Sequence, residues 1–97
     1  MLAEIQVSPR PAGTPENRYA HVDAAIAVIQ SSGLTYEVHA LGTVVEGSPD
    51  EVWALLRRVH EAALAAGATS TASVIKVGQG AEDGGPTIAD LVTTFRP

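Results

Sequence analysis

The chain has 97 residues, 45% of them hydrophobic and 18% charged, with a formal net charge of −5. This length and composition predict one globular domain over residues 1–97, built around a single core. Net acidity with only six scattered basic residues argues against a nucleic-acid partner, and the absence of cysteine excludes disulfides and thiolate metal sites.

The first predicted element is a half-buried strand over residues 2–8. Apolar and polar side chains alternate there, which places Ala3, Ile5 and Val7 on one face. Three prolines and a glycine between positions 9 and 15 then predict a loop, because proline removes a backbone donor. A helix is predicted from residues 15–17 to about residue 32, ended by Gly33, and its inward positions are Val22, Ala25, Ile26 and Ile29.

Two further strands are predicted over residues 35–41 and 43–46, with a bulge or tight turn at Gly42 between them. The chemistry of a helix start follows. Ser48 is a candidate N-cap, proline occupies the first helical position, and Glu51 stands where a capping box has its carboxylate. This helix is predicted over residues 49–66, with inward positions Val52, Leu55, Leu56, Val59 and Ala63.

The remaining chain predicts a strand over residues 71–77, a mobile glycine-rich loop over residues 78–85, and a short helix opened by Pro86. The apolar residues of this helix form one stripe, made by Ile88, Leu91, Val92 and Phe95. A helix of this length is not stable alone, so we expect it to dock on the domain.

The order of elements, β-α-β-β-α-β, is that of a ferredoxin-like α+β sandwich. The expected architecture is a four-stranded antiparallel sheet with two helices on one face and a short C-terminal helix. The other face of the first strand mixes apolar and polar side chains, namely Leu2, Glu4, Gln6 and Ser8. Such faces usually meet another subunit, so we expect a homo-oligomer formed through sheet faces or edges.

The three histidines, His21, His39 and His60, fall in three different predicted elements and form no i, i+4 metal-binding pair. We therefore predict no metal site, and the sequence offers no recognisable catalytic constellation. Trp53, His60 and Leu64 form a stripe that flanks the core face of the second predicted helix. We expect this stripe to pack against the terminal helix or another subunit, with Trp53 as the anchor.

Several short and different segments follow one another along residues 3–92, and their order and spacing together are distinctive. They lie at residues 4–7, 9–14, 19, 32–36, 43–47, 59–61, 67–68 and 75–77. Together they resemble the thiamine-binding-protein-like family, small conserved domains long catalogued as uncharacterised. The resemblance implies a ferredoxin-like domain that assembles into dimers or tetramers through its sheets. It also implies that some members bind thiamine or its pyrimidine precursor.

This chain departs from the family pattern at two places. Ser70 or Thr71 stands where similar sequences have an arginine, and Gly78 stands where they have an acidic residue. Any ligand or tetramer contact made by those charges is therefore missing here.

Thiamine sets specific demands on a binding site. Its thiazolium ring is a fixed cation that favours a carboxylate or an aromatic face, and its aminopyrimidine needs an acceptor and donors. Thr43 and Glu46 are polar residues on an otherwise apolar strand beside a helix start, and they are the predicted anchors. Ser8, His39 and Tyr36 are further candidates. The alternative for Glu46 is a cap on the turn before the second helix, and for Tyr36 it is packing within the sheet.

The sequence therefore predicts a non-enzymatic, oligomeric protein that binds thiamine or its hydroxymethyl-pyrimidine precursor for sequestration, sensing or delivery, without a cofactor. Two alternatives stay open: a structural or regulatory assembly subunit, and a small ferredoxin-like enzyme with an active site between subunits. An RNA-recognition domain shares the topology, but few aromatic residues and net acidity count against it. No apolar run approaches ~20 residues and residues 1–8 lack a signal-peptide pattern, so we expect a cytoplasmic protein without a membrane partner.

Overall fold

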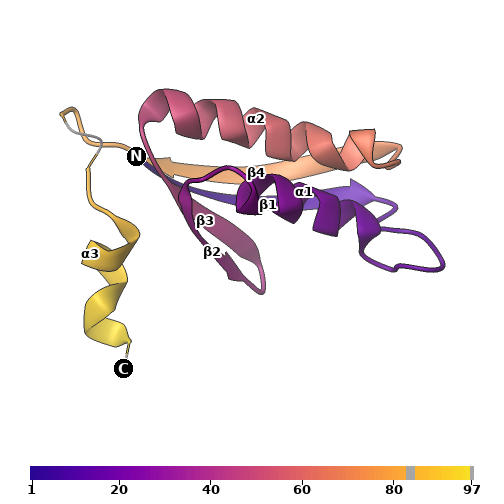
Figure 1. Cartoon of the computed structure of the whole chain (residues 1–97), viewed down its shortest axis with the longest axis horizontal. Helices are drawn as coiled ribbons and strands as arrows, with labels where there is room; N and C mark the ends of the chain where they lie inside the picture. Colours follow the sequence, from indigo (N-terminus) through magenta and orange to yellow (C-terminus); the bar gives the residue numbers. More distant parts are fainter. Residues whose placement is uncertain (83–84, 97) are drawn as a thin grey trace.

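A computed structural model describes residues 1–82 and 85–96 of the chain. Four antiparallel strands form one sheet in the order β2-β3-β1-β4: β1 (Leu2–Arg10), β2 (Thr35–His39), β3 (Gly42–Glu46) and β4 (Ser70–Gly78). Two helices, α1 (Ala20–Gln30) and α2 (Pro49–Ala65), lie side by side over one face of the sheet (Figure 1). After β4 come α3 (Ile88–Val92) and a 3-10 turn, η1 (Thr93–Phe95). The predicted ferredoxin-like sandwich is confirmed, with β1 and β3 at the centre of the sheet.

The core lies between the sheet and the two helices. Apolar side chains alternate along the strands and recur every three or four residues along the helices. All the predicted inward positions of α2 are buried, namely Val52, Leu55, Leu56, Val59 and Ala63. The predicted start of α2 is confirmed as well. Ser48 Oγ accepts the Glu51 N–H at 3.3 Å, and Glu51 Oε1 accepts the Ser48 N–H at 3.1 Å.

The loop between β1 and α1 differs from the predicted one at both ends. β1 runs past Pro9, two residues further than predicted, because β4 pairs with it over that whole length. α1 begins at Ala20 and not at residues 15–17. The reason is local, because Thr14 and Asn17 bond to each other across a turn. The Asn17 N–H donates to Thr14 Oγ1 at 3.1 Å, and the Thr14 N–H donates to the Asn17 carbonyl at 2.8 Å.

The hairpin between β2 and β3 is tighter than predicted. β2 ends at His39, and Ala40 and Leu41 form the turn, so that His39 lies opposite Gly42, the first residue of β3. A Cβ added at Gly42 would lie 3.3 Å from Glu4 Cγ, a close approach that suits glycine. The bounds of α2 and β4 differ from the predicted ones by a single residue at each changed end.

The C-terminal segment docks on the sheet face that α1 and α2 leave open. Thr87 caps α3 in a capping box with Asp90, and the side chain of Ile88 is only 7% exposed. The predicted apolar stripe of this helix is right for Ile88 and for the half-buried Val92, but it is wrong for Leu91 and Phe95, which are 54% and 84% exposed. Leu91 lies within α3 on a side that the sheet leaves largely exposed, and Phe95 lies in the 3-10 turn, where the residue spacing differs from that of an α-helix.

The flanking stripe on α2 does not meet α3. Trp53 and Leu64 are exposed, while His60 Nδ1 lies 2.6 Å from Ser73 Oγ on β4. α3 lies on the other side of the sheet (Figure 1), so the expectation that it covers this stripe is wrong. Packing of Trp53 against another subunit stays a prediction. The predicted mobile loop includes residues 83–84, which lie outside the described residues. No helix in the described ranges is long and apolar enough to cross a membrane.

Candidate functional site

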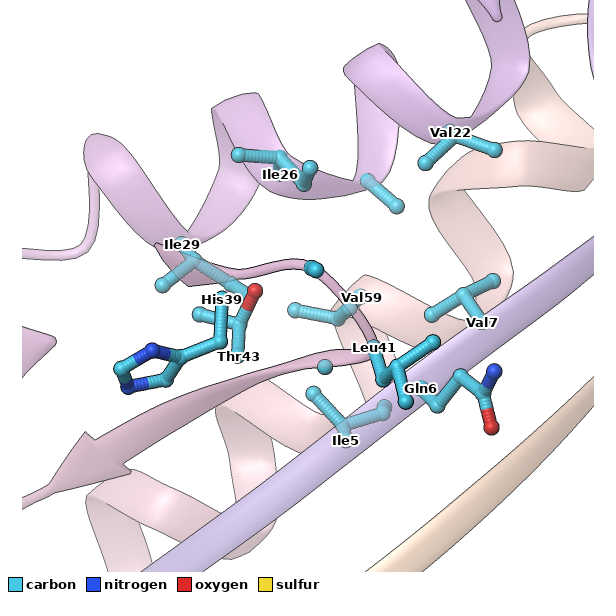
Figure 2. A pocket seen from close by; sticks show the side chains of 13 residues that line it. Ile5, Gln6, Val7, Val22, Ile26, Ile29, His39, Leu41, Thr43 and Val59 are labelled. Atoms are coloured by element: carbon cyan, nitrogen blue, oxygen red, sulfur yellow. The ribbon is translucent and has the colours of Figure 1, made fainter. Parts of the chain in front are cut away.

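A small cavity lies between α1 and the β2–β3 hairpin, on the helix-covered side of the sheet. Its volume is about 150 Å³. Apolar side chains from both helices and from β1 surround it (Figure 2): Ile5, Val7, Val22, Ile26, Ile29 and Val59. Protein cores contain few voids larger than a water molecule, so a space of this size is a candidate ligand site.

The β2–β3 hairpin forms the rim of this cavity. Ala40, Leu41 and Gly42 line the cavity from the turn, and the Leu41 side chain is largely exposed. An exposed leucine in a two-residue turn is unusual, because turns favour glycine and small polar residues. It offers an apolar contact at the entrance. Sequence periodicity does not reveal this role of Leu41, because it assigns the residue to the predicted strand over residues 35–41.

Thr43 supplies a buried polar side chain to the cavity wall. It lies on β3 between Ile5 of β1 and Val38 of β2, faces the helices, and is 4% exposed. Its hydroxyl can both donate and accept a hydrogen bond. The structure therefore places this predicted anchor where a ring with polar atoms could bond to it.

His39 lies at the rim, but its imidazole points away from the α1 side chains (Figure 2). His39 Nε2 lies 3.3 Å from Glu37 Oε2, and Glu37 also accepts two hydrogen bonds from the Arg96 guanidinium. The hydrogen bonds from Arg96 hold the pKa of Glu37 below its ordinary value, and His39 adds a smaller effect in the same direction. These three residues form a polar cluster on the open face of the sheet.

Glu46 lies on the opposite face of the sheet from Thr43. It stands across from Leu2 on β1 and Thr35 on β2, and its Oε1 accepts the N–H of Ile88 at 3.3 Å. It therefore does not line the cavity. It also does not cap the turn before α2, whose capping box is complete without it. The carboxylate instead meets the first turn of α3.

The two remaining candidates lie elsewhere. Ser8 is exposed on the open face of β1, and Tyr36 is partly exposed on the helix-covered side of β2. Neither lines the cavity. The structure thus places Thr43 in the cavity wall and His39 at the rim with its imidazole beside Glu37 on the open face, and it places Glu46, Ser8 and Tyr36 at separate positions.

The other histidines have structural partners. The buried His21 has its Nδ1 2.7 Å from the carbonyl oxygen of Pro11, and His60 pairs with Ser73 between α2 and β4. Over residues 1–82 and 85–96, no group of three or more His, Cys, Asp or Glu side chains is placed to hold a metal ion. The hydroxyl of Thr71, at one position where the family pattern has arginine, is buried without a partner in that part of the chain.

The fold and the cavity define a class of protein: a ferredoxin-like α+β sandwich with a small apolar cavity beside its β2–β3 hairpin. A family model described as "Thiamine-binding protein" matches residues 3–96. The chain therefore belongs to the thiamine-binding protein family, which confirms the resemblance found in the sequence.

Individual relatives agree with this assignment. A UPF0045 protein of Synechocystis sp. is 35% identical over 78 residues, which are 80% of this chain and 63% of that protein. The chain thus spans just under two thirds of that relative. A domain of unknown function, DUF77, from Bacillus cereus has a TM-score of 0.80 and 33% identity, covering 98% of this chain and 90% of that one. A Thermotoga maritima protein, assigned provisionally to thiamine biosynthesis or salvage, has a TM-score of 0.81 and 26% identity, with 98% and 97% coverage.

Proposed function

We propose that this protein binds the aminopyrimidine ring of thiamine, or of its hydroxymethyl-pyrimidine precursor, in the cavity beside the β2–β3 hairpin, without catalysing a reaction. One observation carries the proposal: an apolar cavity whose wall contains the buried residue Thr43, which carries a hydroxyl. Small-molecule sites typically combine apolar walls with a few polar groups that orient the ligand. Membership of the thiamine-binding protein family supports the choice of ligand.

The size of the cavity decides which part of thiamine enters it. An apolar protein cavity of about 150 Å³ holds one aromatic ring such as benzene, and this cavity has about that volume. One ring of thiamine can therefore enter. The neutral aminopyrimidine is the ring that enters, because an unpaired cation is far more costly to remove from water. The thiazolium stays at the rim near Leu41, so the precursor should bind about as tightly as thiamine.

Glu46 cannot offset the thiazolium charge from within the same chain, since its carboxylate is on the open face of the sheet and bonds to Ile88. Glu46 could offset the thiazolium charge only if it came from a second subunit. The net charge of −5 favours a cationic ligand without any single partner.

We further propose that the chain forms a dimer or tetramer through its sheet. β4 is an edge strand of nine residues, and Val74 is largely exposed on it. Long unpaired edges and exposed apolar side chains favour association with another chain. Such an oligomer suits sequestration, sensing or delivery of a small ligand.

Isothermal titration of the full chain with thiamine and with hydroxymethyl-pyrimidine tests the binding proposal. We expect saturable heat from both ligands and a weaker response in Thr43→Val. No heat from either ligand would contradict the proposal and favour a structural or regulatory subunit. Chemical conversion of the ligand during the titration, followed by mass spectrometry, would favour the enzyme alternative.

A further inference from the structure

Residues 87–96, which we name the strap, lie against the open face of the sheet at the end formed by β2 and β3 (Figure 1). A groove of about 290 Å³ remains between the strap and the sheet, and Thr35, Glu37 and Glu46 form its floor. The two ends of the strap are held by different interactions, and these interactions indicate at which end the strap can detach from the sheet.

The first end is fixed by Ile88. Its side chain is 7% exposed, and its N–H donates to Glu46 Oε1 at 3.3 Å. Thr87 and Asp90 close the first turn of α3 through a capping box. This end therefore combines apolar burial, a hydrogen bond to the sheet and a complete helix cap.

The other end is held by Arg96. Its two terminal nitrogens donate to the two carboxylate oxygens of Glu37, and the Nη2–Oε2 distance is 2.6 Å. A bidentate pair of this kind fixes orientation as well as position. Glu37 has a second donor within reach, because His39 Nε2 lies 3.3 Å from Oε2. The carboxylate therefore keeps a partner on β2 when Arg96 leaves.

Only modest apolar burial holds the strap between these two ends. Val92 is half-buried against the groove, whereas Leu91 is 54% and Phe95 84% exposed. An isolated helix of five residues is not stable in water, so α3 persists only while it is docked. Loss of the interaction at one end should therefore loosen the whole strap.

We propose that the strap is a releasable cover of the open sheet face and that the Glu37–Arg96 pair is its latch. Opening of the latch unfolds α3 and exposes the groove and the Glu46 carboxylate to solvent. The latch is an ion pair at the surface, so ionic strength weakens it. The strap lies on the face opposite the cavity, so this inference stands independently of the proposed ligand.

Amide exchange of the full chain, followed by NMR, tests the latch. The variant is Arg96→Gln, and the matched control is Arg57→Gln, which removes the same charge from an ion pair with Glu61 on the outside of α2 (3.0 Å). We expect the amides of residues 88–92 to exchange about two- to fivefold faster in Arg96→Gln, the range for an exposed ion pair. Exchange in α2 and β1 should not change, and Arg57→Gln should match the wild type in the strap.

Salt and a second variant sharpen the test. Raising NaCl from about 0.05 M to about 0.5 M should accelerate strap exchange in the wild type and not in Arg96→Gln. Glu37→Gln should accelerate amide exchange in the strap as much as Arg96→Gln does. The double variant should exchange no faster than either single variant. Unchanged strap exchange in Arg96→Gln would overturn the proposal. So would strap amides that are unprotected in the wild type, or equal acceleration throughout the chain.

A thiol reporter measures accessibility directly. The chain contains no cysteine, so Val92→Cys introduces a single thiol at a half-buried position that lines the groove. The rate at which this thiol reacts with a thiol reagent should rise when Arg96→Gln is added, by about the same two- to fivefold factor as the amide exchange of the strap. An unchanged rate would show that the groove stays covered without the latch, against the proposal.

Discussion

Thr43 and Glu46 stand three residues apart on β3, and their side chains point to opposite faces of the sheet. Thr43 is packed beneath the helices in the wall of the cavity, whereas Glu46 meets the first turn of the strap on the open face. Two residues that the sequence predicts as anchors of one site therefore lie in two different environments. Each environment can be tested by its own substitutions.

Thr43→Val should weaken the binding of thiamine and of hydroxymethyl-pyrimidine by about three- to tenfold. Valine keeps the shape of threonine but removes the hydroxyl, and a net hydrogen bond contributes about 0.5–1.5 kcal/mol. Titration calorimetry measures the change. Thr35→Val is the control, because it removes the same hydroxyl from an exposed position on the open face of β2. Equal affinities in wild type and Thr43→Val would place the ligand outside the cavity.

Ala25→Val should fill part of the cavity at little cost in stability while reducing ligand affinity. Ala25 is buried on α1 and lines the cavity. The matched control is Ala63→Val, at a fully buried position of α2 that does not line it. Both changes carry the same helix-propensity cost, so that cost cancels in the comparison. Overpacking should destabilise Ala63→Val by about 1–3 kcal/mol, and Ala25→Val clearly less, by urea unfolding. A larger loss in Ala25→Val would mean that no usable space exists beside it.

Docking of the strap should weaken in acid. The hydrogen bonds from Arg96 lower the pKa of Glu37 from its ordinary value of 4.5, so the docked state favours the ionised carboxylate. The stabilisation of the docked strap by this ion pair is therefore fully present at a pH above the ordinary pKa of Glu37. It is lost as the pH falls through the lowered pKa of the docked state. The amide chemical shifts of residues 88–92, followed from about pH 6 to about pH 3, report the change.

Arg96→Gln is the comparison for this titration, because Glu46 and Asp90 are also carboxylates at the strap. The part of the shift change that belongs to the latch should be absent in that variant. Identical titration curves in wild type and Arg96→Gln would show that Glu37 does not control docking.

The fold could be predicted because its signals are local. The spacing of Val52, Leu55 and Val59 defines the buried face of α2, and the capping box of Ser48 and Glu51 fixes where that helix begins. Helix periodicity and capping chemistry act within a few residues, so they are visible without knowing the tertiary structure.

The site was less predictable, because it depends on pairing between distant segments. Whether Thr43 faces the helices follows from its register against Ile5, and the position of Arg96 beside Glu37 joins residues far apart in the chain. The prediction that Thr43 and Glu46 anchor one ligand was wrong for a single chain, because residues three apart on a strand point to opposite faces.

The two capping boxes of the chain should differ in their effect on stability. Ser48 caps the long helix α2, which packs along the core, and Thr87 caps the five-residue α3 in the strap. Ser48→Ala should lower the free energy of unfolding by about 1 kcal/mol, because the cap supports a helix that unfolds with the core. Thr87→Ala removes an equivalent hydrogen bond, but the strap can open without unfolding the core, as local openings do. Urea unfolding should therefore show the loss in Ser48→Ala only, while Thr87→Ala should accelerate amide exchange within residues 88–92. Equal losses in global stability would mean that the strap unfolds together with the core and is not a separate unit.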